Sequence, residues 1–262
     1  MARRRFFVDE VRNQHAELLG EEANHLSRVL RVEEGQKYEL SDNQDVYFAE
    51  VEMARKERVV FRVLEKLDAP EPVVQVTLFL ALIKFDRLEW ILEKATELGV
   101  SSIALVRAVR SEKGLDRAAE KRMVRWRRIL LESSQQARRA RLPELFPPVK
   151  LDDALRSGAG YRLFLDEGGT GTSILTALGR PGKPGSASLL IGPEGGWTDV
   201  EREATRAAQW TEVSLGPQIL RTETAAISAL AVINAVWQGI TREGCATMLE
   251  STPQERGRSS AG

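Results

Sequence analysis

The chain has 262 residues, of which 42% are hydrophobic and 29% are charged, and its 38 basic residues balance its 38 acidic residues. These proportions are ordinary for a globular protein with a full hydrophobic core, and a net charge of zero gives no overall nucleic-acid signature. No apolar run approaches the length of about 18 residues that a membrane span needs, and no apolar signal core follows the first arginines, so we expect a cytoplasmic protein. One cysteine and two histidines leave no disulfide framework and no Cys/His metal site, so we expect no metal.

Short β-like runs separated by turn signals fill residues 1–70. They cover residues 5–8, 37–40, 46–53 and 59–64, with an alternation close to that of a half-buried strand. A helical pattern over residues 21–31 interrupts them, and on its charges alone it is an amphipathic connector with a solvated face. Residues 1–70 therefore predict a small β-barrel domain.

The pattern changes after residues 68–72, where two prolines predict a linker. Strands are expected at residues 73–83, 103–109, 161–166, 188–192 and 212–215. Helices are expected at residues 88–98 and 116–139, and after residues 173, 198 and 222. Thr198 and Glu201 have the spacing of a capping box. This alternation predicts an α/β domain with a mainly parallel sheet over residues 73–242.

The last predicted helix, residues 222–240, is apolar nearly all round. Such a helix must be covered on every side, either inside its own domain or by a second subunit. Residues 243–262 lack periodicity and are rich in Ser, Gly, Thr and Arg, so they predict a disordered tail.

The strongest charge feature lies between Lys121 and Arg141, where eight basic residues face one acidic residue, Glu132. Most of these side chains lie off the apolar stripe of the predicted long helix. As a set they favour contacts with nucleic-acid phosphates, although any single arginine is as well explained as a solvated surface charge.

Two Gly-rich turns, residues 189–197 and 215–225, each leave a predicted strand and enter a helical pattern. Backbone N–H groups freed by glycine then lie at the mouth of a parallel sheet, where α/β proteins bind small ligands. Two such turns so close in sequence predict one shared pocket. The Gly/Thr cluster at residues 168–172 is either a flexible loop or a phosphate cradle, and the chain has neither a dinucleotide fingerprint nor a P-loop.

The two turns resemble the signature of the SPOUT class of RNA methyltransferases, specifically the bacterial enzymes that methylate N3 of one uridine in 16S rRNA. The resemblance also includes residues 22–31, Lys84, residues 94–100 and Ser111-Glu112, and it covers residues 1–240. It implies an α/β SPOUT trefoil-knot methyltransferase domain preceded by a PUA-like β-barrel. It also implies S-adenosylmethionine as cofactor, a homodimer, and 16S rRNA, within the 30S subunit, as partner.

The resemblance also assigns roles to residues. The residues expected to bind the cofactor are Leu190, Gly192, Glu194, Gly195, Leu215, Gly216, Leu220, Thr224 and Ala225. Mainly from their positive charge, we expect these residues to bind RNA phosphates: Arg3, Arg28, Arg31, Lys84, Arg125, Arg128 and Arg138. For catalysis we expect Arg139 or Arg221 to stabilise the developing uracil anion, with Glu223 or bulk water taking the N3 proton. Alternatively, Glu223 only charges a helix N-terminus and Arg221 only pairs with it.

The chain departs from the family pattern in two places. The family usually has Gln, then Cys or Ser, Gly and Arg, where this chain reads Gln136-Ala137-Arg138-Arg139, so Arg138 is an alternative to Arg139. Phe85 follows Lys84 where glycine is common. Two other functions stay open: a SPOUT methyltransferase acting on tRNA or 23S rRNA, and a non-catalytic RNA-binding protein of ribosome assembly.

Overall fold

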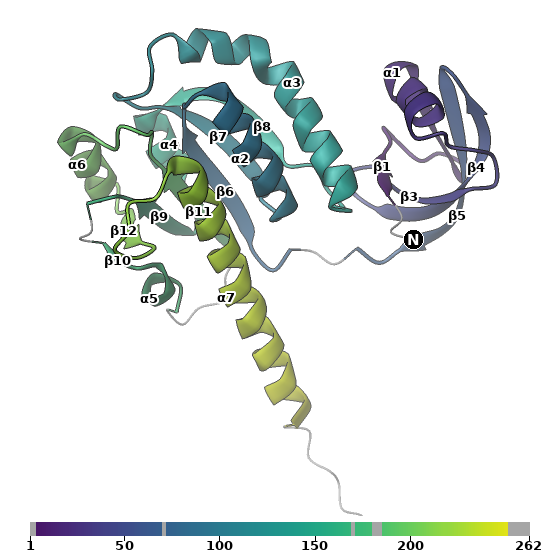
Figure 1. Cartoon of the computed structure of the whole chain (residues 1–262). Helices are drawn as coiled ribbons and strands as arrows, with labels where there is room; N and C mark the ends of the chain where they lie inside the picture. Colours follow the sequence, from purple (N-terminus) through teal and green to yellow (C-terminus); the bar gives the residue numbers. More distant parts are fainter. Residues whose placement is uncertain (1–3, 70–71, 169–170, 180–184, 251–262) are drawn as a thin grey trace, which may run out of the picture.

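A computed structural model describes residues 4–69, 72–168, 171–179 and 185–250 of the chain, with side chains described as far as Trp237. The described residues form a small curled sheet at the N-terminal end and a larger α/β part, joined through residues 68–72 (Figure 1). Arg3, one of the expected RNA-binding residues, lies outside the described residues.

The small sheet has five strands in the order β1-β3-β4-β5-β2. They are β1 (Arg5–Phe7), β2 (His15–Leu19), β3 (Lys37–Ser41), β4 (Val46–Arg55) and β5 (Arg58–Leu67). Strand β1 pairs in parallel with β3, and the other pairs are antiparallel. Phe6, Leu40 and Phe61 are fully buried at its centre. This sheet agrees with the expected β-barrel but includes β2, which was not predicted because its five residues include no β-branched side chain and no Phe, Tyr or Trp.

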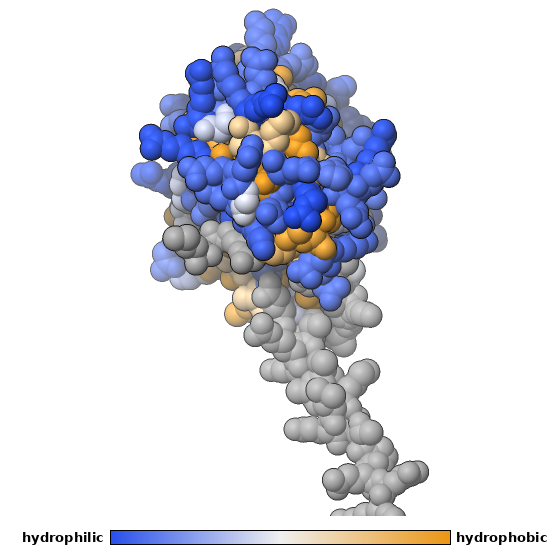
Figure 2. Space-filling view, turned by 90° about the vertical axis from the view of Figure 1, so that its right-hand side faces the viewer, coloured by the Kyte–Doolittle hydropathy of each residue, from blue (hydrophilic) through white to orange (hydrophobic). Residues whose placement is uncertain are grey.

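The helical segment expected at residues 21–31 begins one residue earlier and ends sooner. It starts as α1 (Gly20–Asn24) and continues as one π-helical turn, η1 (His25–Val29). Within this segment, Ala23 and Leu26 are buried, whereas Arg28 is exposed. Figure 2 shows the barrel side of the molecule, whose surface is mainly hydrophilic with apolar side chains visible between the polar ones.

The large sheet has seven strands in the order β10-β12-β9-β11-β6-β7-β8, and all its pairings are parallel. The strands are β6 (Gln75–Ala81), β7 (Ser102–Arg107), β8 (Glu144–Lys150), β9 (Tyr161–Leu165), β10 (Thr172–Ser173), β11 (Ser186–Ile191) and β12 (Thr211–Ser214). Side chains of the central strands alternate between two apolar clusters, so that Leu189 faces one and Leu190 the other. The sheet is therefore buried on both faces, as expected for parallel strands.

Helices cover both faces of this sheet (Figure 1). One face carries α2 (Phe85–Glu97), α3 (Leu115–Gln136), α5 (Ile174–Leu178) and α7 (Thr222–Glu250), and the other carries α4 (Leu151–Ser157) and α6 (Asp199–Ala207). Helix α6 begins with the predicted capping box, in which Thr198 and Glu201 each satisfy a backbone N–H of the other. None of the helices among the described residues has the length and hydropathy required to span a membrane.

Several elements and boundaries differ from the sequence-based expectation, which included neither helix α4 nor strand β10. Strand β8 was missed because it contains Pro147 and Pro148, which are compatible with a strand only at the edge of a sheet, where β8 lies. Helix α3 ends at Gln136, since Arg138 has a positive φ of 54°. Helix α7 runs to Glu250, so the backbone of residues 243–250 is helical where a disordered tail was expected. The remainder of that tail, residues 251–262, lies outside the described residues.

Helix α7 is buried on one face rather than on every side. Ala226, Ala229, Leu230 and Ile233 are fully buried against the sheet and its neighbouring helices. Ala231 and Ala235, on its other face, are exposed in the single chain. The apolar helix is thus only partly covered by its own domain.

Candidate functional site

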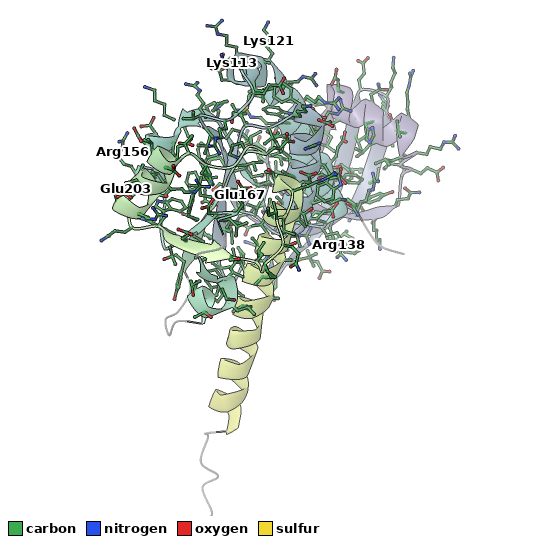
Figure 3. The ribbon with its side chains drawn as sticks, turned by 60° about the vertical axis from the view of Figure 1, so that its left-hand side comes forward. Lys113, Lys121, Arg138, Arg156, Glu167 and Glu203 are labelled. Carbon is green, nitrogen blue, oxygen red and sulfur yellow. The ribbon has the colours of Figure 1, made fainter. Side chains whose placement is uncertain are left out.

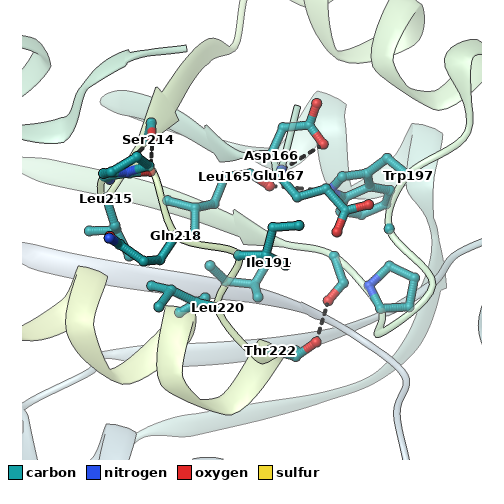
Figure 4. A pocket seen from close by; sticks show the side chains of 17 residues that line it. Leu165, Asp166, Glu167, Ile191, Trp197, Ser214, Leu215, Gln218, Leu220 and Thr222 are labelled. Carbon is teal, nitrogen blue, oxygen red and sulfur yellow. Dashed lines mark hydrogen bonds between the residues drawn. The ribbon is translucent and has the colours of Figure 1, made fainter. Parts of the chain in front are cut away.

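A pocket opens at the carboxyl ends of three neighbouring parallel strands, β12, β9 and β11 (Figure 4). Three chain segments and the start of α7 form its wall. Its lining residues are Leu165, Asp166, Glu167, Ile191, Gly192, Pro193, Gly196, Trp197, Ser214, Leu215, Gly216, Pro217, Gln218, Ile219, Leu220, Thr222 and Ala225. Both Gly-rich turns therefore share one pocket, as the sequence predicted, at the sheet edge where α/β proteins bind ligands.

Hydrogen bonds hold the first turn against its neighbours. The hydroxyl of Thr222, at the start of α7, donates to the carbonyl of Gly192 over 3.3 Å. The indole N–H of Trp197 donates to the carbonyl of Leu165 over 3.3 Å, which ties the turn to the end of β9. Because Thr222 and Trp197 are both buried, these bonds are shielded from water and fix the pocket wall.

Two arginines hold the outer side of the same turn. Arg110 donates to the carbonyls of Gly195 (2.8 Å) and Trp197 (3.3 Å), and Arg87 of α2 forms an ion pair with Glu194. The carboxylate of Glu194 is therefore directed to Arg87. Neither Glu194 nor Gly195 lines the pocket, and both lie on the back of the turn.

Glycine is favoured at two positions of this turn, by close packing against a buried indole at Gly192 and by the backbone conformation at Gly196. A Cβ atom on Gly192 would lie 2.7 Å from the indole nitrogen of Trp197. Gly196 has a φ of 68°, and a Cβ atom there would lie 2.1 Å from a carboxylate oxygen of Glu167. The pocket wall thus consists of bare backbone along this stretch.

The second turn is shaped by Ser214, whose hydroxyl donates to the carbonyl of Gly216 and accepts from its N–H, over 3.0 and 3.2 Å. The chain then runs through Gln218 and Leu220 along the opposite wall of the pocket before entering α7 (Figure 4). Leu215 and Leu220 give this wall an apolar surface.

The segment after β9 supplies the acidic groups of the pocket. Asp166 forms an ion pair with Arg202 of α6 over 2.8 Å, and its side chain is only 2% exposed. The hydrogen bond to Asp166 raises the pKa of Arg202 above its ordinary value, despite the opposing effect of burial. Glu167 is exposed, and its carboxylate has no hydrogen-bond or ion-pair partner in the described part of the chain. Glu167 is therefore the carboxylate available to a bound ligand.

The structure brings together five of the nine residues expected to bind the cofactor: Gly192, Leu215, Gly216, Leu220 and Ala225. Leu190, Glu194, Gly195 and Thr224 do not line the pocket, and Leu190 faces the apolar cluster beneath α4 and α6. Sequence reasoning missed the third segment, with Asp166 and Glu167. Its signal was available, since these residues follow a predicted strand whose carboxyl end lies at the same sheet edge.

Two of the three expected catalytic residues flank the pocket. Arg221 is exposed, and its guanidinium has no polar partner among the described side chains. Oε2 of Glu223 is buried and has no hydrogen-bond partner in the described part of the molecule. The alternative in which Arg221 pairs with Glu223 is therefore not what the structure shows. In sequence, Arg221 lies between Leu220 and Thr222. Glu223 lies between Thr222 and Ala225, and all three of these neighbours line the pocket.

Arg139, the third expected catalytic residue, lies at the opposite edge of the sheet. Its guanidinium donates to the carbonyls of Thr96 (2.7 Å), Val100 (2.6 Å) and Arg141 (3.1 Å). It lines a cleft with Gln75, which begins β6, whereas the pocket lies at the carboxyl end of β11, the parallel neighbour of β6. Burial lowers the pKa of Arg139 to about 10. Within one chain, Arg139 therefore lies away from the pocket and holds backbone carbonyls, and its expected catalytic role stays a prediction.

The residues expected to bind RNA divide into two groups. Arg28, Arg31 and Lys84 are exposed and have no polar side-chain partner among the described residues. By contrast, Arg125 holds Glu89 with two hydrogen bonds of 2.8 Å, Arg128 pairs with Glu132, and Arg138 pairs with Glu39. The charge of the long helix is thus partly neutralised by its neighbours, although Lys121 at its N-terminal end projects away from the body (Figure 3).

Comparisons with known proteins agree with this architecture. Residues 69–234, well over half of the chain, match the RNA methyltransferase domain family, and residues 18–64 match its PUA domain. The chain belongs to this RNA methyltransferase family. The expected fold class, an α/β SPOUT trefoil-knot methyltransferase domain preceded by a PUA-like β-barrel, is confirmed.

Relatives within the family are similar over nearly their whole length. The ribosomal RNA small subunit methyltransferase E of Bacillus subtilis is 31% identical over 250 residues, which cover 88% of this chain and 95% of the relative. The protein of the same name from Mycobacterium bovis is 32% identical over 242 residues, covering 88% and 91%.

Solved structures agree as well. The ribosomal RNA small subunit methyltransferase E of Neisseria gonorrhoeae, bound to S-adenosylmethionine, has a TM-score of 0.81 at 28% identity and covers 90% of this chain and 98% of its own. A methyltransferase of Legionella pneumophila in complex with the same cofactor has a TM-score of 0.81 at 31% identity, with the same coverage. The chain is therefore similar in both sequence and fold to enzymes of this family.

Proposed function

We propose that this protein transfers a methyl group from S-adenosylmethionine to N3 of one uridine in 16S rRNA of the small ribosomal subunit. Family membership and the names of the relatives support an rRNA methyltransferase. The observation that carries the proposal is the pocket that the two Gly-rich turns and the segment after β9 form at one sheet edge.

The residues of the pocket fit S-adenosylmethionine. Leu215, Leu220 and Ala225 offer apolar surface to an adenine ring, while the bare backbone at Gly192 allows close approach of the ligand. Glu167 offers a carboxylate to a ligand that carries positive charge on its sulfonium and its amino group. When bound, the cofactor would supply a methyl group on its sulfonium, and the nucleophile would attack that methyl carbon in line with the bond to sulfur, which breaks.

Arg221 and Glu223 are suited to the uracil side of the reaction. N3 of uracil carries a proton, so the base must leave its stack and lose that proton before its lone pair can accept the methyl group. The unpaired guanidinium of Arg221 would stabilise the negative charge that spreads onto the uracil oxygens. The unpartnered Oε2 of Glu223 would accept the proton. Glu223 is in the first turn of α7 and Arg221 directly precedes that helix, and both are neighbours in sequence of the pocket-lining residue Thr222, which supports this assignment.

We further propose that the enzyme works as a homodimer in the cytoplasm, on 16S rRNA within the 30S subunit. The exposed apolar face of α7, which includes Ala231 and Ala235, supports the dimer, because an apolar face left uncovered in one chain is suited to a second copy.

Methyl transfer to defined substrates tests this function. The purified protein is mixed with S-adenosylmethionine labelled in its methyl group and with 30S particles, free 16S rRNA, 23S rRNA or tRNA from cells that lack the protein. We expect label in 30S particles or 16S rRNA, recovered after digestion as N3-methyluridine. Label only in tRNA or 23S rRNA would reassign the target, and binding of rRNA without any transfer would indicate a non-catalytic RNA-binding protein.

A further inference from the structure

Arg138 and Arg139 are adjacent in the chain but hold different parts of the protein. Arg139 donates to carbonyls at and beyond the end of α2, those of Thr96 and Val100, and is thereby fixed to the large α/β part. Arg138 points the other way, toward the barrel, where it forms an ion pair with Glu39 of β3. The chain at this point is therefore anchored on both sides.

Glu39 is the centre of the contact on the barrel side. It is only 6% exposed and accepts hydrogen bonds from both Arg138 and Arg5. Arg5 in turn donates to the backbone carbonyl of Arg138 over 2.7 Å. Three charged side chains, from β1, β3 and the segment after α3, thus form one closed cluster between the two parts of the protein.

Two further hydrogen bonds flank this cluster. The hydroxyl of Ser41 donates to the carbonyl of Ala140 over 2.5 Å, and the side-chain oxygen of Asn43 accepts from the N–H of Leu142 over 2.7 Å. We call these bonds, together with the cluster of Arg5, Glu39 and Arg138, the interdomain contact. It is polar throughout, so it specifies a geometry more than it contributes hydrophobic stability.

The backbone at Arg138 gives a second reason to assign it a specific role. Its φ of 54° is in the left-handed region, which glycine adopts freely and longer side chains adopt at a conformational cost. Arginine at this position therefore carries a conformational cost that its own side chain offsets through Glu39. Residues held in such a conformation persist only when their surroundings determine it.

We propose that the cluster of Arg5, Glu39 and Arg138 fixes the orientation of the barrel relative to the methyltransferase domain, and that Arg138 is thereby a positioning residue for the rRNA substrate. This second step rests on the proposed function, because an RNA bound by both domains must meet the pocket in one register. The barrel carries Arg28 and Arg31 on its exposed surface, whereas the pocket lies at the far edge of the large sheet. A change in barrel angle would displace RNA held by those arginines from the pocket.

The test uses the full-length protein and the variant Arg138→Gly. This variant removes the ion pair with Glu39 and also removes the conformational cost of the positive φ at this position. Spin labels at positions 56 and 113, on a Cys245→Ser background, report the distance between the barrel and the α/β part. We expect a narrow distribution in the parent protein and a broadened one in Arg138→Gly. Glu39→Gln, which keeps the shape of the side chain, should broaden it as well. Arg62→Gln, which breaks a surface pair with Glu50 inside the barrel, is the matched control and should leave it narrow.

Steady-state kinetics distinguish a role of Arg138 in positioning the substrate from a role in folding alone. Arg138→Gly should raise the KM for 30S particles about tenfold, equal to about 1.4 kcal/mol, while kcat and the Kd for S-adenosylmethionine stay within twofold. An unchanged distance distribution would overturn the proposal, as would a broadened distribution with an unchanged KM. If the parent protein methylates no rRNA while the distances broaden as expected, the proposed function fails and the structural role of the cluster stands.

Discussion

The hydroxyl of Thr222 donates a hydrogen bond of 3.3 Å to the carbonyl of Gly192, and this bond links the two Gly-rich turns across 30 residues of sequence. Thr222 is also the first residue of α7, so the same side chain ties both turns to the helix that has Glu223 in its first turn and that Arg221 directly precedes. The shape of the pocket and the position of the proposed catalytic groups therefore depend on one another.

Replacing Thr222 tests this link. Thr222→Val keeps the shape but leaves the part-buried carbonyl of Gly192 without its donor, which should lower the free energy of unfolding by about 1 kcal/mol. We expect the Kd for S-adenosylmethionine to rise several-fold in calorimetry, and Thr222→Ser to retain parental affinity. A valine variant with parental affinity and stability would show that the bond does not shape the pocket.

Gly192→Ala should damage cofactor binding without a general loss of fold. The added Cβ atom would lie 2.7 Å from the indole nitrogen of Trp197, so the indole must move and lose its bond to Leu165. We expect a Kd for S-adenosylmethionine raised at least about tenfold. Gly185→Ala is the control, because a Cβ atom there meets nothing within 4 Å. Equal affinities in the two variants would contradict the close contact at Gly192.

Glu223→Gln tests the proposed proton acceptor. The amide keeps the size of the side chain but cannot take the N3 proton, so kcat should fall by about 100-fold or more. The Kd for S-adenosylmethionine should stay within twofold, since Glu223 does not line the pocket. If single-turnover methyl transfer proceeds at the parental rate, bulk water or another group takes the proton and Glu223 only charges the start of α7.

Arg28 and Arg31 should contribute to RNA binding more directly than Arg125 and Arg128 of α3, which form ion pairs with neighbouring carboxylates. Because both are exposed and have no polar side-chain partner among the described residues, the double variant Arg28→Ala/Arg31→Ala should reduce the salt slope of RNA affinity by about 2. Arg156→Ala, at a surface arginine of α4 that pairs with Asp153, should leave the slope unchanged. An unaltered slope in the double variant would remove this face of the barrel from the RNA footprint.

The ion pairs of Glu39 predict a pH dependence of stability. Burial alone would raise the pKa of Glu39, but hydrogen bonds from Arg138 and Arg5 outweigh it and lower the pKa below its ordinary value. When the pKa of a carboxylate is lower in the folded state, its ionised form stabilises the protein at pH values above the pKa of the unfolded state, which is about 4.5 here. This stabilisation is lost as the pH falls through the pKa of the folded state. Glu39→Gln should therefore cost about 1.5–3 kcal/mol at pH 7 and less at pH 3 than at pH 7 in urea unfolding. An equal cost at both pH values would contradict this origin.

The sequence predicted well what is determined locally. The capping box of Thr198 and Glu201 involves residues only three positions apart. Likewise, the Gly-Pro pairs in the two Gly-rich turns predict sharp bends from adjacent residues alone. By contrast, the place of Arg139 depends on carbonyls at Thr96 and Val100, about 40 residues away in the chain, and no local pattern encodes that contact. The contacts of Arg139 with the end of α2 could therefore not be predicted from the sequence, and its expected catalytic role stays a prediction.

Tertiary context also explains the missed elements. The two prolines of β8 argue against a strand until the edge position is known, since only there is the missing N–H of proline tolerated. Glu167 was missed because the Gly/Thr cluster that follows it was weighed alone, without the neighbouring ends of β11 and β12. Parallel register brings these three ends together, and register is a property of the whole sheet.

The most direct test of the proposed function is mass spectrometry of nucleosides from 16S rRNA of cells with and without this protein. We predict that N3-methyluridine at one position is present in the parent, absent in the deletion strain, restored by the intact gene and not restored by the Gly192→Ala variant. Retention of N3-methyluridine at its full level in the deletion strain would contradict the proposed function.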